Sequence, residues 1–188
     1  MLTLKPPAFK HFCVNINRGN IRSAIHLVDA IIVSCNQQLV GPKNKNHWRF
    51  NKQNCEQVVH AESGGYIDKI SGVNNKLMQA ARKQYPQGVD IGNAIVTSSF
   101  NNNVDDKFKF VIHACSPWRT QEKDDINVKK LLKSTYKNAL YLAIRTKNIK
   151  SIAIPALGCG VNLIDPVTSA RAALNAIIDI ENETIGND

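Results

Sequence analysis

The run of residues 151–162 most constrains the fold, because a short apolar strand leads there into a loop of small residues. The strand ends at Pro155, and the loop 158–162 (Gly-Cys-Gly-Val-Asn) leads to Asp165-Pro166, where an apolar periodic segment begins. Asp is a favoured N-cap and Pro suits the first helical position, so the spacing predicts strand, loop and helix in succession. Backbone N–H groups of such a loop, beside the positive end of a helix dipole, can cradle an anion.

The same loop is also typical of an ordinary strand-to-helix turn that uses glycine for its backbone freedom. A dinucleotide-binding fingerprint fits poorly, since Leu163 stands where the third glycine belongs. A P-loop is excluded because no Gly-Lys-Ser/Thr follows. The choice between a phosphate-binding loop and a simple turn therefore depends on the rest of the chain.

Hydrophobic periodicity along the chain predicts an α/β domain. Strands are expected at 11–17, 28–35, 92–99, 107–115 and 151–155, and helices at 74–83, at 126–146 and from Pro166 onward. The last helix is expected to turn one apolar face inward, made of Val167, Ala170, Leu174, Ile177 and Ile178. Alternating strands and helices imply a three-layer α/β/α sandwich with a mixed, largely parallel central sheet. Ligands of such sheets bind beyond the carboxyl ends of strands, where Asn36 and the 158–162 loop both fall.

Length and composition set the outer limits of the domain. With 188 residues, 43% of them hydrophobic, the chain can form one core, so we expect a single monomeric domain over 8–182 with flexible ends at 1–7 and 183–188. The absence of an apolar run of about 20 residues argues against a membrane span. The N-terminus lacks the apolar core of a secretory signal, and the five cysteines are dispersed and odd in number. This pattern predicts reduced thiols and a cytoplasmic or nuclear protein.

The net charge of +9 favours binding to polyanions such as RNA. The basic segment 43–65 carries Lys43, Lys45, Arg49 and Lys52 around Trp48 and Phe50, and it reads either as a nucleic-acid patch or, in the interpretation we favour, as an exposed insertion loop. A second lysine series (Lys129, Lys130, Lys133 and Lys137) is typical of a solvated helix face. A zinc site built from Cys35, His47, Cys55 and His60 is not expected, because their spacing matches no compact ligand pair. The sequence predicts neither a metal nor a cofactor.

Four segments, in order along the chain, resemble the macro domain, the ADP-ribose-binding α/β module. Residues 19–22 (Gly-Asn-Ile-Arg) resemble its Gly-Asp-Ile-Thr element, and 28–36 resemble the strand that ends in Asn-Ala-Ala-Asn. Residues 110–118 are similar to Val-Ile-His-Thr-Val-Gly-Pro, and 154–161 are similar to the diphosphate loop Pro-Ala-Ile-Ser-Thr-Gly-Val. Together they cover most of residues 11–180, with an insertion after the strand that ends at Asn36.

The resemblance implies a role for each matching position. Asn20, with Ile21 beside it, is expected to accept a hydrogen bond from adenine, and Asn36 to bind the distal ribose. Gly72 and Val73 are expected to form the loop on the other side of the ribose and phosphate. His113 is expected to pack in the core. The diphosphate loop comprises Pro155, Leu157, Gly158, Cys159, Gly160, Val161 and Asn162, whose N–H groups at 158–161 are expected to wrap the diphosphate.

Departures from the family pattern affect catalysis more than binding. The family has a glycine-rich loop, which the basic insertion interrupts in this chain. The loop continues either at residues 63–65 or at residues 71–73. The second alignment places Asn74 where hydrolases of the family carry a catalytic Asp, and an amide cannot act as a general base. The first alignment places Asp68 near the position of that Asp. Asn162 and Leu163 replace an aromatic residue and a glycine. Asn36, Asn74 and Asp68 are thus the catalytic candidates. Binding of ADP-ribose or ADP-ribosylated macromolecules is the favoured function, with mono-ADP-ribose hydrolysis and RNA or poly(ADP-ribose) binding as alternatives.

Overall fold

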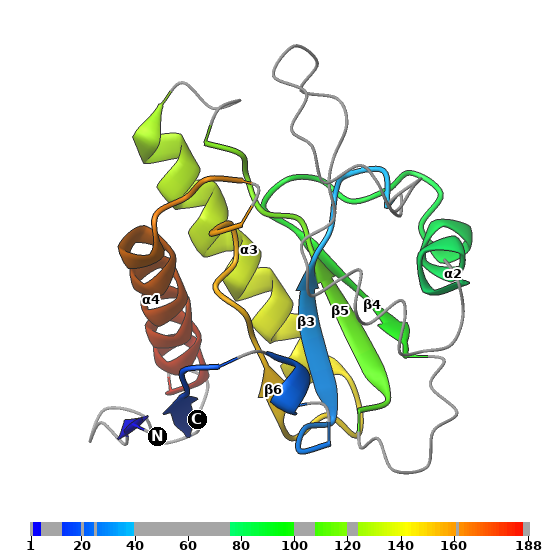
Figure 1. Ribbon diagram of the computed structural model, residues 1–188, viewed down its shortest axis with the longest axis horizontal. Coiled ribbons are helices and arrows are strands. Elements are labelled where there is room, and N and C mark those ends of the chain that lie inside the picture. Colours follow the sequence, from blue (N-terminus) through cyan, green and yellow to red (C-terminus); the bar gives the residue numbers. More distant parts are fainter. Residues whose placement is uncertain are drawn as a thin grey trace.

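A four-stranded sheet, in the order β4-β5-β3-β6, forms the centre of the computed structural model (Figure 1). The structure describes residues 2–4, 13–19, 21–24, 26–39, 76–99, 108–119, 124–160 and 162–185. The strands are β3 (Ala30–Ser34), β4 (Ala94–Ser98), β5 (Phe110–Ala114) and β6 (Ile152–Ala153). β3 runs parallel to β5 and β6, whereas β4 is antiparallel to β5, so the predicted mixed, largely parallel sheet is confirmed.

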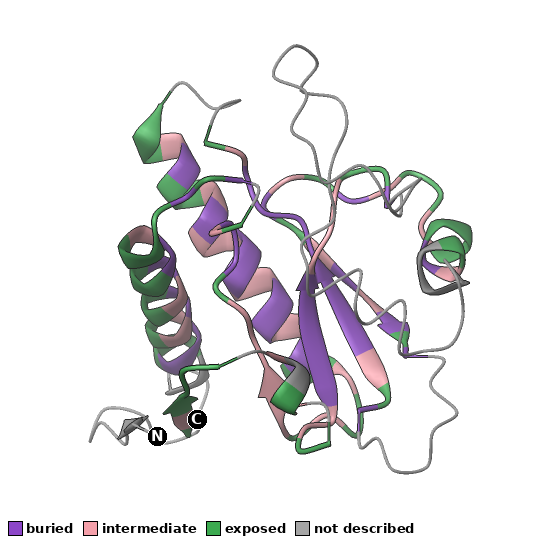
Figure 2. Cartoon of the chain, viewed as in Figure 1, coloured by how far each residue is buried: buried purple, intermediate pink, exposed green. Residues whose placement is uncertain are grey.

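The two long helices cover one face of this sheet (Figures 1 and 2). They are α3 (Asp125–Arg145) and α4 (Pro166–Ile185). Ile32 of β3 and Ile112 of β5 share the main buried cluster with Leu132 of α3 and Ala176 of α4. Removing an Ile or Leu side chain from water stabilises the fold by about 1.5–3 kcal/mol, so this face, which has the larger buried cluster, is the main source of stability.

The opposite face carries a smaller core, and the three-layer prediction is therefore confirmed. Ile31 and Val33 of β3 pack with Phe108 and with Ile21, which begins the 3-10 helix η1 (Ile21–Ala24). Helix α2 (Lys76–Gln84) contacts β4 on the same side and contributes its buried Ala81. His113 is fully buried, with its Nε2 3.0 Å from Thr97 Oγ1, as expected of a core histidine.

The inward face of α4 differs from the prediction. Val167, Leu174 and Ile178 are 59%, 38% and 43% exposed, whereas Ala172 and Ala176 are buried. Ala170 is exposed as well, and only Ile177 of the predicted set packs against the core. Ile180, 1% exposed, belongs to the same buried cluster, so the face of α4 that meets the core combines small residues with a large apolar one.

Half of the predicted lysine face is paired rather than solvated. Lys129 and Lys130 are exposed as expected. Lys133 Nζ, however, lies 2.7 Å from Asp179 Oδ2, and Lys137 forms an ion pair with Glu183. These pairs join the outer surfaces of α3 and α4.

The N-terminal segment forms a small sheet of its own. Strand β1 (Leu2–Leu4), within the stretch expected to be flexible, pairs antiparallel with β2 (Val14–Ile16). The predicted strand at 11–17 is therefore present, but it lies outside the central sheet and its Ile16 is 47% exposed. At the other end α4 continues to Ile185. None of the helices in the described ranges is long and apolar enough to cross a bilayer.

Candidate functional site

The candidate site lies where three parallel strands end. β3, β5 and β6 point the same way, so the segments that follow them, beginning at Cys35, Cys115 and Ile154, meet at one edge of the sheet. The Cys35 N–H donates to the carbonyl of Ala114 at 3.0 Å, which holds the turn after β3 beside the end of β5. This edge is the usual ligand position in open α/β sheets.

Two helices hold the start of the 158–162 loop through Leu157. The Leu157 N–H donates to Tyr136 Oη at 2.7 Å, and the Ser169 hydroxyl donates to the Leu157 carbonyl at 2.8 Å. Tyr136 Oη lies 2.7 Å from Ser169 Oγ and donates to it, since the Ser169 proton is already used. All three residues are buried, and burial raises the pKa of Tyr136. Leu157 is therefore an anchor: its backbone groups, expected to line the ligand site, are occupied by the protein itself.

The two glycines of the loop have different roles. Gly158 has a φ of +79°, and a Cβ placed there would lie 2.6 Å from Ile164 Cδ1, so the position requires glycine. Gly160 is exposed, and a Cβ there would meet nothing within 4 Å. The Cys159 N–H donates weakly to the Ala156 carbonyl at 3.3 Å. Gly158 is buried whereas Gly160 is exposed, and no hydrogen bond within the described ranges uses the N–H group of either residue.

Asn162 fastens the other end of the loop. Its Nδ2 lies 3.0 Å from the Ser116 carbonyl, 3.1 Å from Ser116 Oγ and 3.0 Å from the Pro117 carbonyl. Its own carbonyl accepts the Arg119 N–H at 3.0 Å, and the residue is buried. The Asn162 side chain, expected to line the ligand site, thus binds the segment after β5 instead. In the sequence, the replacement of an aromatic residue by Asn162 was the only sign of these hydrogen bonds.

Main-chain contacts within the described residues hold the turn after β3. The Asn36 carbonyl accepts the Leu39 N–H at 3.1 Å, and the Gln37 carbonyl accepts the Val89 N–H at 2.9 Å. Gly88 has a φ of +78°, and a Cβ there would lie 2.1 Å from the Gln37 carbonyl oxygen. Asn36 itself is half-buried, at the same strand edge as the 158–162 loop.

Several predicted residues lie elsewhere or outside the described ranges. Ile21 packs against the core cluster of Ile31 and Phe108, and Pro155, which has no N–H to donate, is half-buried. The residues that fall outside the description are Asn20, Asp68, Gly72, Val73, Asn74 and Val161, together with the basic segment 43–65 and its His47, Cys55 and His60.

The thiols near the site are poor nucleophiles. Burial raises the pKa of Cys159, whose Sγ lies 3.9 Å from the Leu157 carbonyl. Burial and the neighbouring Cys115 raise the pKa of Cys35 well above its usual value. Because thiolates are the reactive form, neither residue is suited to nucleophilic catalysis at neutral pH. The described residues contain no cluster of three or more His, Cys, Asp or Glu that could hold a metal ion.

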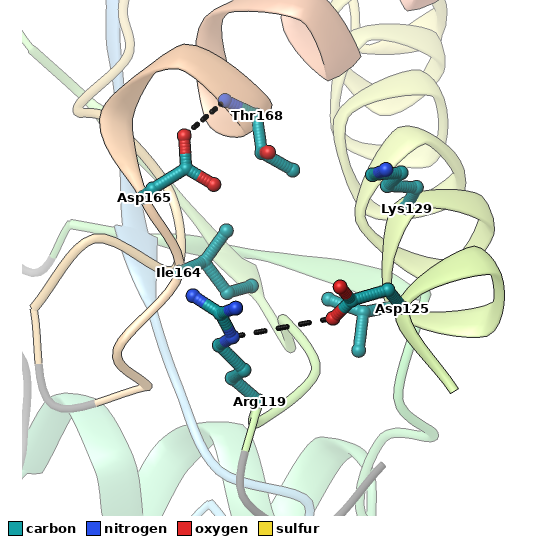
Figure 3. A pocket seen from close by; sticks show the side chains of 7 residues that line it. Arg119, Asp125, Lys129, Ile164, Asp165 and Thr168 are labelled. Carbon is teal, nitrogen blue, oxygen red and sulfur yellow. Dashed lines mark hydrogen bonds and ion pairs between the residues drawn. The ribbon is translucent and has the colours of Figure 1, made fainter. Parts of the chain in front are cut away.

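A cavity of about 180 Å³ lies on the helix side of the loop, between the N-terminal ends of α3 and α4 (Figure 3). Among the described residues, the charged side chains that line it are Arg119, Lys129, Asp125 and Asp165, two of each sign. Asp165 caps α4, accepting the Thr168 N–H at 2.9 Å, and hydrogen bonds from Thr168 lower the pKa of this carboxyl. With its charges balanced and its helix end capped by a carboxylate, this cavity is unsuited to an anion. The exposed side of the loop is the better site.

Known proteins share this architecture. The family model described as macro domain matches residues 50–173, about two thirds of the chain. A macro domain-containing protein of Caldanaerobacter subterraneus subsp. tengcongensis is 29% identical over 167 residues, which cover 88% of this chain and 79% of that protein.

The solved structures agree at the level of the fold. The macrodomain of Oceanobacillus iheyensis with ADP has a TM-score of 0.62 at 24% identity, covering 83% of this chain and 70% of that chain. The Trypanosoma brucei macrodomain in complex with ADP-ribose has a TM-score of 0.56 at 18% identity, covering 83% of this chain and 53% of that chain. The sheet order, the loop at the strand ends and the match to the family model lead to one conclusion: the chain belongs to the macro domain family.

Proposed function

We propose that this protein binds ADP-ribose, free or attached to a macromolecule, with the diphosphate on the N–H groups of Gly158 and Gly160. The observation that carries this proposal is the pair of loop donors left unused by the described protein, at the carboxyl end of a parallel strand. Backbone N–H groups are strong ligands for phosphate oxygens. Solved macrodomains named as complexes with ADP and with ADP-ribose support the choice of ligand.

The anchors around the loop support binding without a large rearrangement. Tyr136 and Ser169 fix Leu157, the residue before Gly158. The side chain of Asn162, the last residue of the loop, fixes the other end to Ser116. A loop already held in place loses little conformational entropy when a ligand arrives, so its few hydrogen bonds contribute more to affinity. Asn36, across the strand edge, is the proposed partner of the distal ribose.

Calorimetric titration with ADP-ribose tests the proposal, and we expect one site per chain with micromolar or somewhat weaker affinity. Gly160→Glu places a carboxylate where a Cβ has open space, so the variant should fold, yet repulsion of the diphosphate should lower the affinity at least about tenfold. Gly160→Gln has the same size without the charge and should weaken binding much less. Absence of heat at millimolar ADP-ribose would refute the proposal.

We further propose that binding occurs without efficient hydrolysis of mono-ADP-ribose. Asp165, the carboxylate next to the loop, caps α4 and has a lowered pKa, so it is a weak base at neutral pH. The other candidates, Asp68 and Asn74, lie outside the described ranges. Incubation with a mono-ADP-ribosylated protein should leave the modification in place, and release of ADP-ribose that is abolished by Asn36→Ala would show an enzyme instead.

Binding of RNA or poly(ADP-ribose) through the basic segment 43–65 is the remaining proposal, supported by the net charge of +9. It predicts an affinity that falls steeply with salt, because every neutralised phosphate releases counterions. A salt-independent affinity would contradict it.

A further inference from the structure

A second concave surface begins at the residue after Asn36. It encloses about 350 Å³ between the turn after β3, the end of α2 and the segment that leads to β4. The polar side chains that line it are Gln37, Gln38, Arg82, Gln87 and Asp90. We call this surface the glutamine groove.

The floor of the glutamine groove is fixed by the backbone. The Val89 N–H donates to the Gln37 carbonyl at 2.9 Å, and the Gly88 N–H donates to the Tyr85 carbonyl at 3.0 Å. Gly88 lies so close to the Gln37 carbonyl that no side chain fits between the turn after β3 and the turn that contains Gly88. Gln38 and Gln87 are both exposed, so their side chains are accessible from solvent.

The chemistry of the glutamine groove suits a polypeptide. Each primary amide offers both N–H donors and a carbonyl acceptor, which complement the N–H and C=O groups of a peptide main chain. Among the described residues that line the groove, the charges of Arg82 and Asp90 cancel. Nucleic acids bind chiefly through neutralised phosphates, and this described lining offers no surplus of cations for them.

We infer that the glutamine groove binds the polypeptide segment next to an ADP-ribosylated residue, with Gln38 and Gln87 hydrogen-bonding its main chain. This inference rests on the proposed function, because the groove begins at Gln37, the residue after Asn36, which is the proposed partner of the distal ribose. It makes the preferred ligand an ADP-ribosylated protein rather than free ADP-ribose or a modified nucleic acid.

The test compares free ADP-ribose with a mono-ADP-ribosylated peptide of about ten residues in parallel calorimetric titrations. Two or three added hydrogen bonds should make the peptide conjugate bind about tenfold tighter. The double variant Gln38→Ala/Gln87→Ala should lose this gain, while its affinity for free ADP-ribose stays within about twofold of the original protein. Gln84→Ala is the matched control, since Gln84 is an exposed α2 glutamine outside the groove lining, and it should retain the gain.

The outcomes separate this inference from the function on which it rests. Equal affinities for the conjugate and for free ADP-ribose would overturn the inference and leave the proposed function intact. The same would hold if an ADP-ribosylated oligonucleotide showed the tenfold gain and lost it in the double variant, because the groove would then bind nucleic acid. Failure of every ligand to bind would overturn both proposals together.

Discussion

The two halves of the candidate site are held in place by different means. The loop that follows Leu157 is fixed by buried side chains. Tyr136 and Ser169 bind the backbone of Leu157, and the side chain of Asn162, at the end of the loop, binds Ser116. In the turn that contains Asn36, the described contacts are main-chain hydrogen bonds and the close approach of Gly88 to the Gln37 carbonyl.

This difference determines how each half tolerates change. Side-chain anchors can be removed one at a time, and each loss leaves a buried polar group without its partner. Main-chain anchors are insensitive to most substitutions, but they fail where an added Cβ pushes two backbones apart. The predictions below probe the main-chain half first and then the side-chain half, in order of decreasing effect.

Gly88→Ala should produce the largest loss of stability. Its Cβ would lie 2.1 Å from a backbone oxygen, and the φ of +78° disfavours any side chain. Left-handed strain and overpacking together should lower the free energy of unfolding by about 4 kcal/mol, measured by urea denaturation. An unchanged midpoint would show that the two turns can separate freely.

Gly158→Ala should cost less, about 2–3 kcal/mol, although its φ is similar. Its added Cβ would meet the end of the Ile164 side chain, which can shift, rather than a backbone atom. Gly160→Ala is the matched control and should change stability by less than about 0.5 kcal/mol, since a Cβ there meets open space. Equal losses for Gly158→Ala and Gly160→Ala would contradict this account of the loop.

Tyr136→Phe should lower stability by about 2 kcal/mol, because the buried Leu157 N–H loses its acceptor. The phenol also gives a pH signature. Burial raises its pKa above that of the unfolded chain, so its stabilising contribution is complete below pH about 10 and is lost as the pH rises through the folded-state pKa. An absorbance titration of the phenolate should show a late-titrating component that disappears in the variant. A titration curve that the substitution leaves unchanged at high pH would argue against the buried anchor.

Leu163→Gly should give the smallest effect, a gain of about 0.5 kcal/mol. Leu163 has a φ of +57° and is 50% exposed, so glycine relieves backbone strain while little buried area is lost. Leu163→Ala removes the same side chain but keeps the strain, and it should show no gain in melting temperature. Equal melting temperatures for the two variants would show that the strain at this position is negligible.

Local patterns predicted the central elements well. The apolar run at 28–35 contains β3, the run at 107–115 contains β5, and the periodic segment at 126–146 differs from α3 by one residue at each end. These elements are buried in the way their patterns require, so period and composition suffice. The start of α4 at Pro166 was also predicted, because the Asp-Pro signal acts within one turn of the helix.

Long-range partners could not be predicted in the same way. Apolar residues occur on several sides of α4 between residues 170 and 180, so its period could not select the face that meets α3, and packing placed Ala172, Ala176 and Ile180 inward. The antiparallel pairing of β1 with β2 depends on contacts between the two strands, which neither strand encodes alone.

By itself the sequence determined the α/β class, the position of the glycine loop and the strand that precedes Asn36, because each depends on residues near one another in the chain. Only the tertiary structure decided which loop groups remain for a ligand. Leu157 and Asn162 are occupied by Tyr136 and by the Ser116–Pro117 segment, 21 and 45–46 positions away. A hydrogen-bond donor is occupied by any acceptor that the fold brings within about 3 Å of it. The local sequence does not encode which distant residues come that close.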